Sequence, residues 1–148
     1  MPQDTVIGII GGQGWMGRAL GLSLLEKNII HADQLIVSSR SESDNAYRDW
    51  PNVRHVKDNH KLVDLADVIV LSIRPEDLKS ININANEKLV ISLLAMVSSK
   101  EVSSQIGSLR VVRAMPNAAA EIQRAYFPWH ASPKVTCIDK QLEQTLLE

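Results

Sequence analysis

A glycine-rich motif is the strongest chemical signal in this sequence. It reads Gly12-Gln13-Gly14-Trp15-Met16-Gly17, directly after the apolar stretch 6–10 and at the start of a helix-like segment. In that context the first glycine permits a tight turn, the second lets a pyrophosphate approach the backbone, and the third lets helix and strand pack closely. The helix start also favours an anion. The motif predicts a dinucleotide site, and the alternatives are a plain turn or a site for a flavin or S-adenosylmethionine.

A second polar group lies where the ribose of a dinucleotide would be recognised. About 20 residues after the glycine loop, an NAD site has Asp or Glu at the end of the second strand. This sequence has Ser38, Ser39 and Arg40 there. Hydroxyls and a guanidinium can bind a 2′-phosphate, whereas a carboxylate would repel it. The sequence therefore favours NADP(H) over NAD(H), with the alternative that Arg40 is a solvated charge and Asp44 reaches the ribose.

The rest of the chain alternates short apolar segments with polar segments of helical length, which is typical of an α/β fold. Strands are expected at residues 5–11, 34–39, 53–56, 67–73, 88–93 and 109–115. Helices or helical turns are expected at residues 15–28, 41–50, 59–66, 74–81 and 98–106. In the first helix, Met16, Leu20 and Leu24 share one face that can pack on the sheet. The pattern loosens after residue 115, with an interrupted strand at 124–131 and a short helix at 139–147.

Several of these strands are almost entirely apolar, so we expect helices to cover them on both faces. The sequence predicts one doubly wound, mainly parallel α/β domain of the Rossmann type over residues 1–148, in which late strands can run antiparallel. In such a sheet the loops after parallel strands meet at one edge. The glycine loop is therefore expected to share one crevice with Ser38, Ser72, Ser92 and Pro116.

Composition and charge exclude several classes of protein. The 148 residues carry 16 basic and 17 acidic side chains, so a net charge of −1 provides no basic field for nucleic acid or an anionic membrane. The apolar runs are too short to span a bilayer, and the start of the chain lacks a signal-peptide pattern. A single cysteine, Cys137, excludes an internal disulfide and suits a reducing compartment. The sequence predicts a soluble, cytoplasmic protein.

No side chain stands out as catalytic. The histidines are scattered in polar contexts without metal-ligand spacing, which predicts surface positions and no metal site. They are His31, His55, His60 and His130. Tyr126 and Trp129 are expected in a half-buried core or interface position rather than lining a pocket. The catalytic residues therefore stay unassigned.

Four segments together carry a family resemblance. They are the glycine loop with Met16, residues 67–75, residues 89–95 and residues 111–117. In this order and spacing they resemble the amino-terminal domain of pyrroline-5-carboxylate reductases, over almost the whole chain. The most specific segment is Arg113-Ala114-Met115-Pro116-Asn117, which is similar to the family's R-x-M-P-N. The glycine loop with methionine is less specific, because prephenate dehydrogenases share it.

The resemblance implies roles at the matching positions. Ser39 and Arg40 match a turn that holds the 2′-phosphate of NADPH. Ser72-Ile73-Arg74-Pro75 is similar to the family's A-V-K-P beside the nicotinamide-side ribose, and Met115-Pro116-Asn117 is similar to the segment beside the nicotinamide ring and the substrate. The alternatives are that Arg74 is a solvated charge and that Asn117 is an ordinary turn residue.

The reaction implied by the resemblance is hydride transfer from NADPH to a small cyclic imine acid, in proline biosynthesis. Family members also have a helical domain that forms a homodimer and completes the substrate pocket, and nothing in residues 1–148 corresponds to it. The chain alone is thus expected to bind cofactor with little or no turnover, either as a fragment or as a naturally short relative. The alternatives are a prephenate dehydrogenase-like oxidoreductase domain, which Gly11 and Trp15 favour, and a non-catalytic nucleotide-binding or regulatory module.

Overall fold

The computed structural model describes residues 4–39, 46–114 and 129–131, and these form a seven-stranded sheet of order β3-β2-β1-β4-β5-β6-β7. Strands β1 to β6 run parallel, and β7 runs antiparallel to β6. The predicted doubly wound α/β fold is confirmed. The strands are β1 (Ile7–Ile10), β2 (Leu35–Ser38), β3 (Arg54–Val56), β4 (Val68–Leu71), β5 (Leu89–Ser92), β6 (Val111–Ala114) and β7 (Trp129–Ala131).

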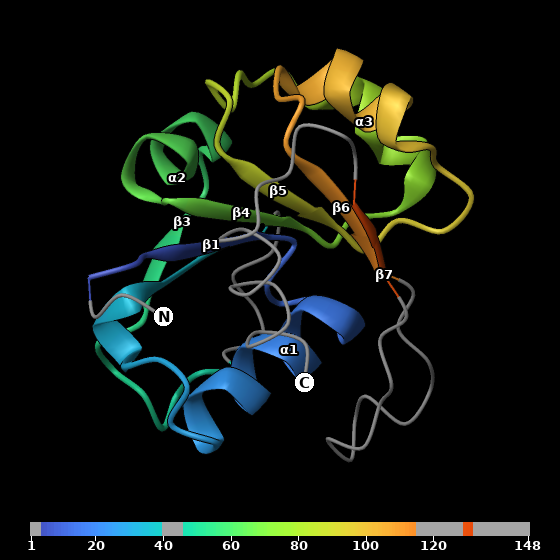
Figure 1. Ribbon diagram of the computed structural model, residues 1–148. Helices are drawn as coiled ribbons and strands as arrows, with labels where there is room; N and C mark the ends of the chain where they lie inside the picture. The colour runs from blue at the N-terminus through green and yellow to red at the C-terminus, as the bar shows by residue number, and fades with distance from the viewer. Residues whose placement is uncertain (1–3, 40–45, 115–128, 132–148) are drawn as a thin grey trace.

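Helices cover both faces of this sheet (Figure 1). Helix α1 (Trp15–Glu26) packs on one face, and α2 (Asn59–Leu65) and α3 (Ser99–Ile106) pack on the other. A 3-10 helix, η2 (Pro75–Ser80), joins the second face, and the short η1 (Ala32–Gln34) leads into β2. Among the described residues, no helix has the length and apolar character needed to cross a membrane.

The central strands are apolar on both sides because each side faces a helical layer. In β4, Val68 and Val70 join the core under α1, while Ile69 and Leu71 join the core under α2 and α3. The predicted apolar face of the first helix is also confirmed. Leu20 and Leu24 are buried against the sheet, and the partly buried Met16 packs against the same cluster. Both faces of the sheet are therefore buried under helices.

Two of the segments expected as helices or helical turns form the shorter kind of structure. Segment 74–81 forms the 3-10 helix η2, with Pro75 at its first position, where no backbone N–H is needed. In segment 41–50, residues 46–49 form turns, and residues 41–45 lie outside the described part. The helix expected at 139–147 also lies outside it.

The strand order places a switch point between β1 and β4, where successive crossovers leave in opposite directions. The loops that follow β1, β2, β3 and β4 all emerge at the carboxyl edge of the sheet beside this point. Open α/β sheets bind their ligands at such crevices. We therefore expect the ligand-binding site at these four loops.

Candidate functional site

The loop after β1 is a tight turn held by the end of β2. The N–H groups of Gly11 and Gly12 both donate to the carbonyl of Ser38, each at 3.0 Å. Gly11 has a φ of +85°, and a Cβ on it would collide with the carbonyl of Ser72. At Gly12 a Cβ would lie 2.5 Å from Cβ of Val37. The sequence predicted that Gly12 permits the tight turn, but the residue with the positive φ is Gly11. A glycine is needed at position 12 because a side chain there would collide with Val37.

The other two glycines of the motif have opposite surroundings. A Cβ on Gly17 would collide with the carbonyl of Gly11, so helix α1 packs directly on the loop. A Cβ on Gly14 would have 3.2 Å to the carbonyl oxygen of Gly11 and 4.0 Å to that of Ser72, and Gly14 is exposed. Gly14 is the N-cap of α1, with no side-chain cap and no acidic residue in the first turn. Because first-turn amides have no carbonyl partner within their helix, this end can take an anion.

Tyr47 supports the glycine loop from the core. Its side chain is 1% exposed, and its hydroxyl donates to the carbonyl of Gly12 at 2.7 Å and, more weakly, to that of Gly17 at 3.4 Å. Burial raises the pKa of the Tyr47 phenol well above its usual value, and the charge of Arg18 opposes this shift in part. The hydroxyl therefore stays protonated and remains a donor. Sequence reasoning missed this residue because no motif marks it.

Gln13 links the glycine loop to two distant segments. Its Oε1 accepts from the N–H of Ala46 at 3.2 Å, which places Nε2 3.3 Å from Nδ1 of His55. The amide Nε2 is a donor, so Nδ1 of His55 accepts and the ring is neutral in this arrangement. Partial burial lowers the pKa of His55, which favours the same state. The ring also meets Tyr47 edge-on, with centroids 5.9 Å apart.

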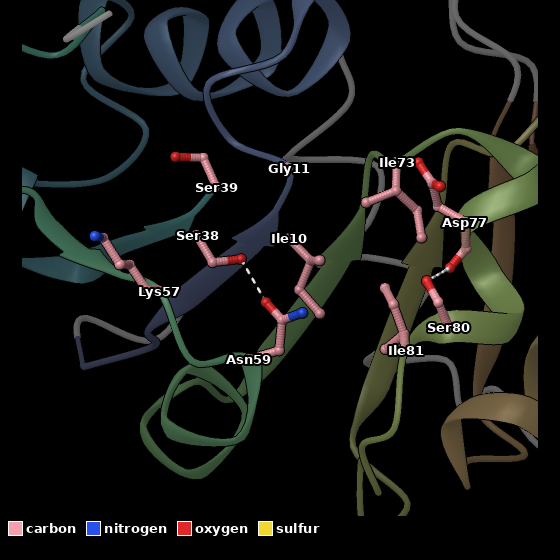
Figure 2. Close-up of a pocket in the computed structure, with 10 residues that line it drawn as sticks. All are labelled: Ile10, Gly11, Ser38, Ser39, Lys57, Asn59, Ile73, Asp77, Ser80 and Ile81. Carbon is pink, nitrogen blue, oxygen red and sulfur yellow. Dashed lines mark hydrogen bonds between the residues drawn. The ribbon is translucent and has the colours of Figure 1, made fainter. Parts of the chain in front are cut away.

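A cavity of about 260 Å³ opens at the carboxyl edge beside this loop (Figure 2). One wall is polar, and the opposite wall combines Ile73 and Ile81 with Asp77 and Ser80. In the polar wall the hydroxyl of Ser38 donates to Oδ1 of Asn59 at 2.7 Å. The lining residues are Ile10, Gly11, Ser38, Ser39, Lys57, Asn59, Ile73, Asp77, Ser80 and Ile81.

The structure brings some of the predicted site residues together and separates others. Ser38, Ser39 and Ile73 line the cavity. Ser72 is half-buried, and its carbonyl faces Gly11. Ser92 is fully buried, and its hydroxyl accepts from the N–H of Leu94 at 3.4 Å, so its side chain does not line the cavity.

Among the remaining predicted residues, Arg74 and Pro75 are exposed at the start of η2, and Trp15 is 45% exposed at the start of α1. The side chain of Met16 is partly buried against the core. Arg40, Pro116 and Asn117 lie outside the described residues. His31, His55 and His60 are exposed, which agrees with their prediction as surface residues, although Gln13 and Tyr47 cover part of the ring of His55.

Of the ten lining residues, sequence reasoning predicted only Ser38, Ser39 and Ile73 as site residues. Lys57 and Asn59 follow β3 at the same edge as the predicted residues, so the rule that directs attention to strand ends could have found them. Asp77, Ser80 and Ile81 come from η2 and the residue after it, and only the packing of Leu78 and Ile81 into the core under α2 and α3 brings this segment to the edge. No sequence signal marks them.

Comparison with known proteins identifies the family. Residues 6–96 match the family model described as NADP oxidoreductase, coenzyme F420-dependent. The chain belongs to this family. The match contains the glycine loop and all the cavity residues.

Individual relatives confirm the resemblance to the amino-terminal domain of pyrroline-5-carboxylate reductases. The chain is 32% identical to such a reductase from Synechocystis sp. over 124 residues, which are 78% of this chain and 45% of that protein. It is 33% identical to the reductase of Methanosarcina acetivorans over 132 residues, 83% of this chain and 48% of that protein. The solved structure of a pyrroline-5-carboxylate reductase from Coxiella burnetii superposes with a TM-score of 0.88 at 27% identity, covering 97% of this chain and 56% of that one. The chain thus spans about half the length of these relatives.

Proposed function

We propose that this chain is an NADPH-binding domain, with the pyrophosphate at the first turn of α1. The observation that carries the proposal is the contrast between Gly14 and Gly17. Gly17 is buried and enclosed by the backbone of the loop, whereas Gly14 is exposed at the start of the helix, beside the switch point of the sheet. A family described by its use of NADP and relatives that are pyrroline-5-carboxylate reductases support the same cofactor.

The choice of NADPH over NADH is proposed to depend on the residues after β2. Ser39 lines the cavity and Arg40 follows it in sequence, so a hydroxyl and a guanidinium replace the carboxylate of an NAD site. A carboxylate would instead accept hydrogen bonds from a free 2′-hydroxyl. The polar wall of the cavity is thus suited to a phosphorylated ribose.

The proposed activity is reduction of a C=N bond in a small cyclic imine acid, as the names of the relatives indicate for those proteins. The bound nicotinamide would supply the hydride to the imine carbon, while a proton goes to the nitrogen. This chain's residues would bind and orient the cofactor, with residues 72–75 on the nicotinamide side and Pro116 and Asn117 near the ring. Because the chain spans about half of its relatives' length, we propose that its own turnover is low and that further residues, in a homodimer, complete the substrate pocket.

Titration of the chain with NADPH and with NADH, followed by nucleotide fluorescence, tests the cofactor proposal. NADPH should bind more tightly. An Arg40→Asp variant should lose this preference, because a carboxylate repels the 2′-phosphate. Arg48→Asp, an equal charge change at an exposed residue away from the cavity lining, is the control and should keep the preference. An unchanged preference in Arg40→Asp would refute the role of Arg40, and a chain that binds neither nucleotide would refute the proposed function.

Activity assays with two candidate substrates test the proposed reaction, on a longer form of the protein if the gene encodes one. Oxidation of NADPH with pyrroline-5-carboxylate would support imine reduction. Reduction of a nicotinamide nucleotide with prephenate would favour the other oxidoreductase class. Tight nucleotide binding with neither reaction would favour a non-catalytic module.

A further inference from the structure

The polar wall of the cavity is built from the ends of two neighbouring strands. Ser38 pairs in register with Val56, so the next residues, Ser39 and Lys57, lie level with each other on adjacent parallel strands. Such strands are about 4.8 Å apart. Figure 2 shows the side chains of Ser39 and Lys57 on the same side of the cavity. A hydroxyl and an ammonium therefore border one end of this space.

The remaining groups of this wall are also suited to an anion. Asn59 accepts from Ser38 through Oδ1, and Figure 2 shows its amide nitrogen turned away from Ser38, toward the centre of the cavity. Asp77, the one acid among the ten lining residues, lies on the opposite wall. Asp58 is next to Lys57 in sequence, but its Oδ1 caps helix α2 by accepting from the N–H of His60 at 2.9 Å. Lys57 is thus the one basic residue among the ten lining residues, and it lies on the same wall as the hydroxyl of Ser39 and the amide of Asn59.

The size of the cavity limits what it can hold. Whole small-molecule sites usually have volumes of about 300–1,000 Å³. A space of about 260 Å³ fits one half of a dinucleotide better than the whole. The adenosine half is the one that binds beside the end of β2, where its ribose is recognised. Ile10 and Ile81 offer an aliphatic surface for a flat base.

We propose that Lys57 contacts the 2′-phosphate of the bound cofactor and makes the cavity selective for a phosphorylated adenosine ribose. This inference rests on the proposed NADPH function and adds a cation from a second strand, independent of Arg40. Lys57 is an exposed side chain at the mouth of the cavity, so replacing it leaves the core intact. It acts as a specificity-determining residue for NADPH against NADH.

Calorimetry on the full chain and a Lys57→Gln variant tests the proposal with four probes: NADPH, NADH, adenosine 2′,5′-bisphosphate and AMP. Lys57→Gln should lower the affinity for NADPH and for the bisphosphate about tenfold at low salt, because it removes a charge-assisted contact with the 2′-phosphate. Binding of NADH and AMP should stay unchanged. Lys61→Gln, which neutralises an exposed lysine on α2 that is not part of the cavity lining, is the matched control and should change none of the four.

The outcomes separate this inference from the proposed function. If the unmodified chain binds NADPH and Lys57→Gln keeps the same ratio of NADPH to NADH affinity, the role of Lys57 is overturned while the function stands. An equal loss for all four probes would also overturn it, because the lysine would then act on the fold or the 5′-phosphate. If the unmodified chain binds neither dinucleotide, the proposed function falls, and the bisphosphate and AMP still decide whether the cavity selects a 2′-phosphate. A chain that binds none of the four overturns both.

Discussion

Removing the hydroxyl of Tyr47 should loosen the glycine loop without disturbing the core around it. In Tyr47→Phe the ring stays, so the packing of this fully buried side chain is retained. What is lost is the 2.7 Å hydrogen bond to the carbonyl of Gly12 and the weaker 3.4 Å bond to that of Gly17. The Gly12 carbonyl is then left without this donor in a buried part of the loop.

The size of the effect follows from this geometry. Leaving a buried carbonyl without its partner costs about 1–3 kcal/mol, and the longer second bond adds little. A loss of about 2 kcal/mol in the free energy of unfolding lowers the Tm of a chain this long by roughly 4–8 °C. Since the same carbonyl belongs to the turn that precedes the helix start, NADPH affinity should fall together with the stability.

Thermal unfolding and NADPH titration of Tyr47→Phe measure both effects. The matched control is Ser108→Ala, which removes another buried hydroxyl that donates to a backbone carbonyl, that of Lys88 at 2.6 Å. The control should lower the Tm by a similar amount and leave NADPH affinity unchanged, because it lies outside the cavity lining and the glycine loop. A Tyr47→Phe variant with normal Tm and normal affinity would refute the support that we assign to this hydroxyl.

Two further predictions concern the same loop. Gly17→Ala should lower the Tm more than Gly14→Ala, because its Cβ would collide with the carbonyl of Gly11, whereas the Cβ of Gly14→Ala would lie 3.2 Å from that oxygen, a tight contact that a small shift relieves. Both variants should bind NADPH more weakly, and equal Tm losses measured by calorimetry would contradict this. Burial lowers the pKa of His55 from its usual 6.5, so the imidazole takes up a proton more readily in the unfolded chain than in the folded one. The contribution of neutral His55 to the free energy of unfolding is therefore complete above about pH 6.5 and is lost as the pH falls below that value. Tm measured against pH should therefore be flatter in His55→Gln, and parallel curves would show that another group is responsible.

Much of the fold could be predicted from the sequence because its signals are local. The strand segments are apolar and short enough to be recognised one at a time, and each of β1 to β6 lies inside its predicted range. The spacing of Leu20 and Leu24 similarly predicts the buried face of α1. The sequence also predicted a helix or helical turn at 74–81, but it did not distinguish between the two. The structure shows a 3-10 helix whose Leu78 joins the core under α2 and α3.

The candidate site divides in the same way. The sequence by itself determined that a glycine loop follows β1 and that hydroxyls follow β2, since both are patterns of residue type along one segment. Only the tertiary structure decided that Gly11 cannot carry a side chain, because the collision there comes from Ser72, which follows β4. The register of β3 against β2 likewise brings Lys57 level with Ser39. Contacts between strands depend on register and on the direction of each crossover, which no single segment encodes.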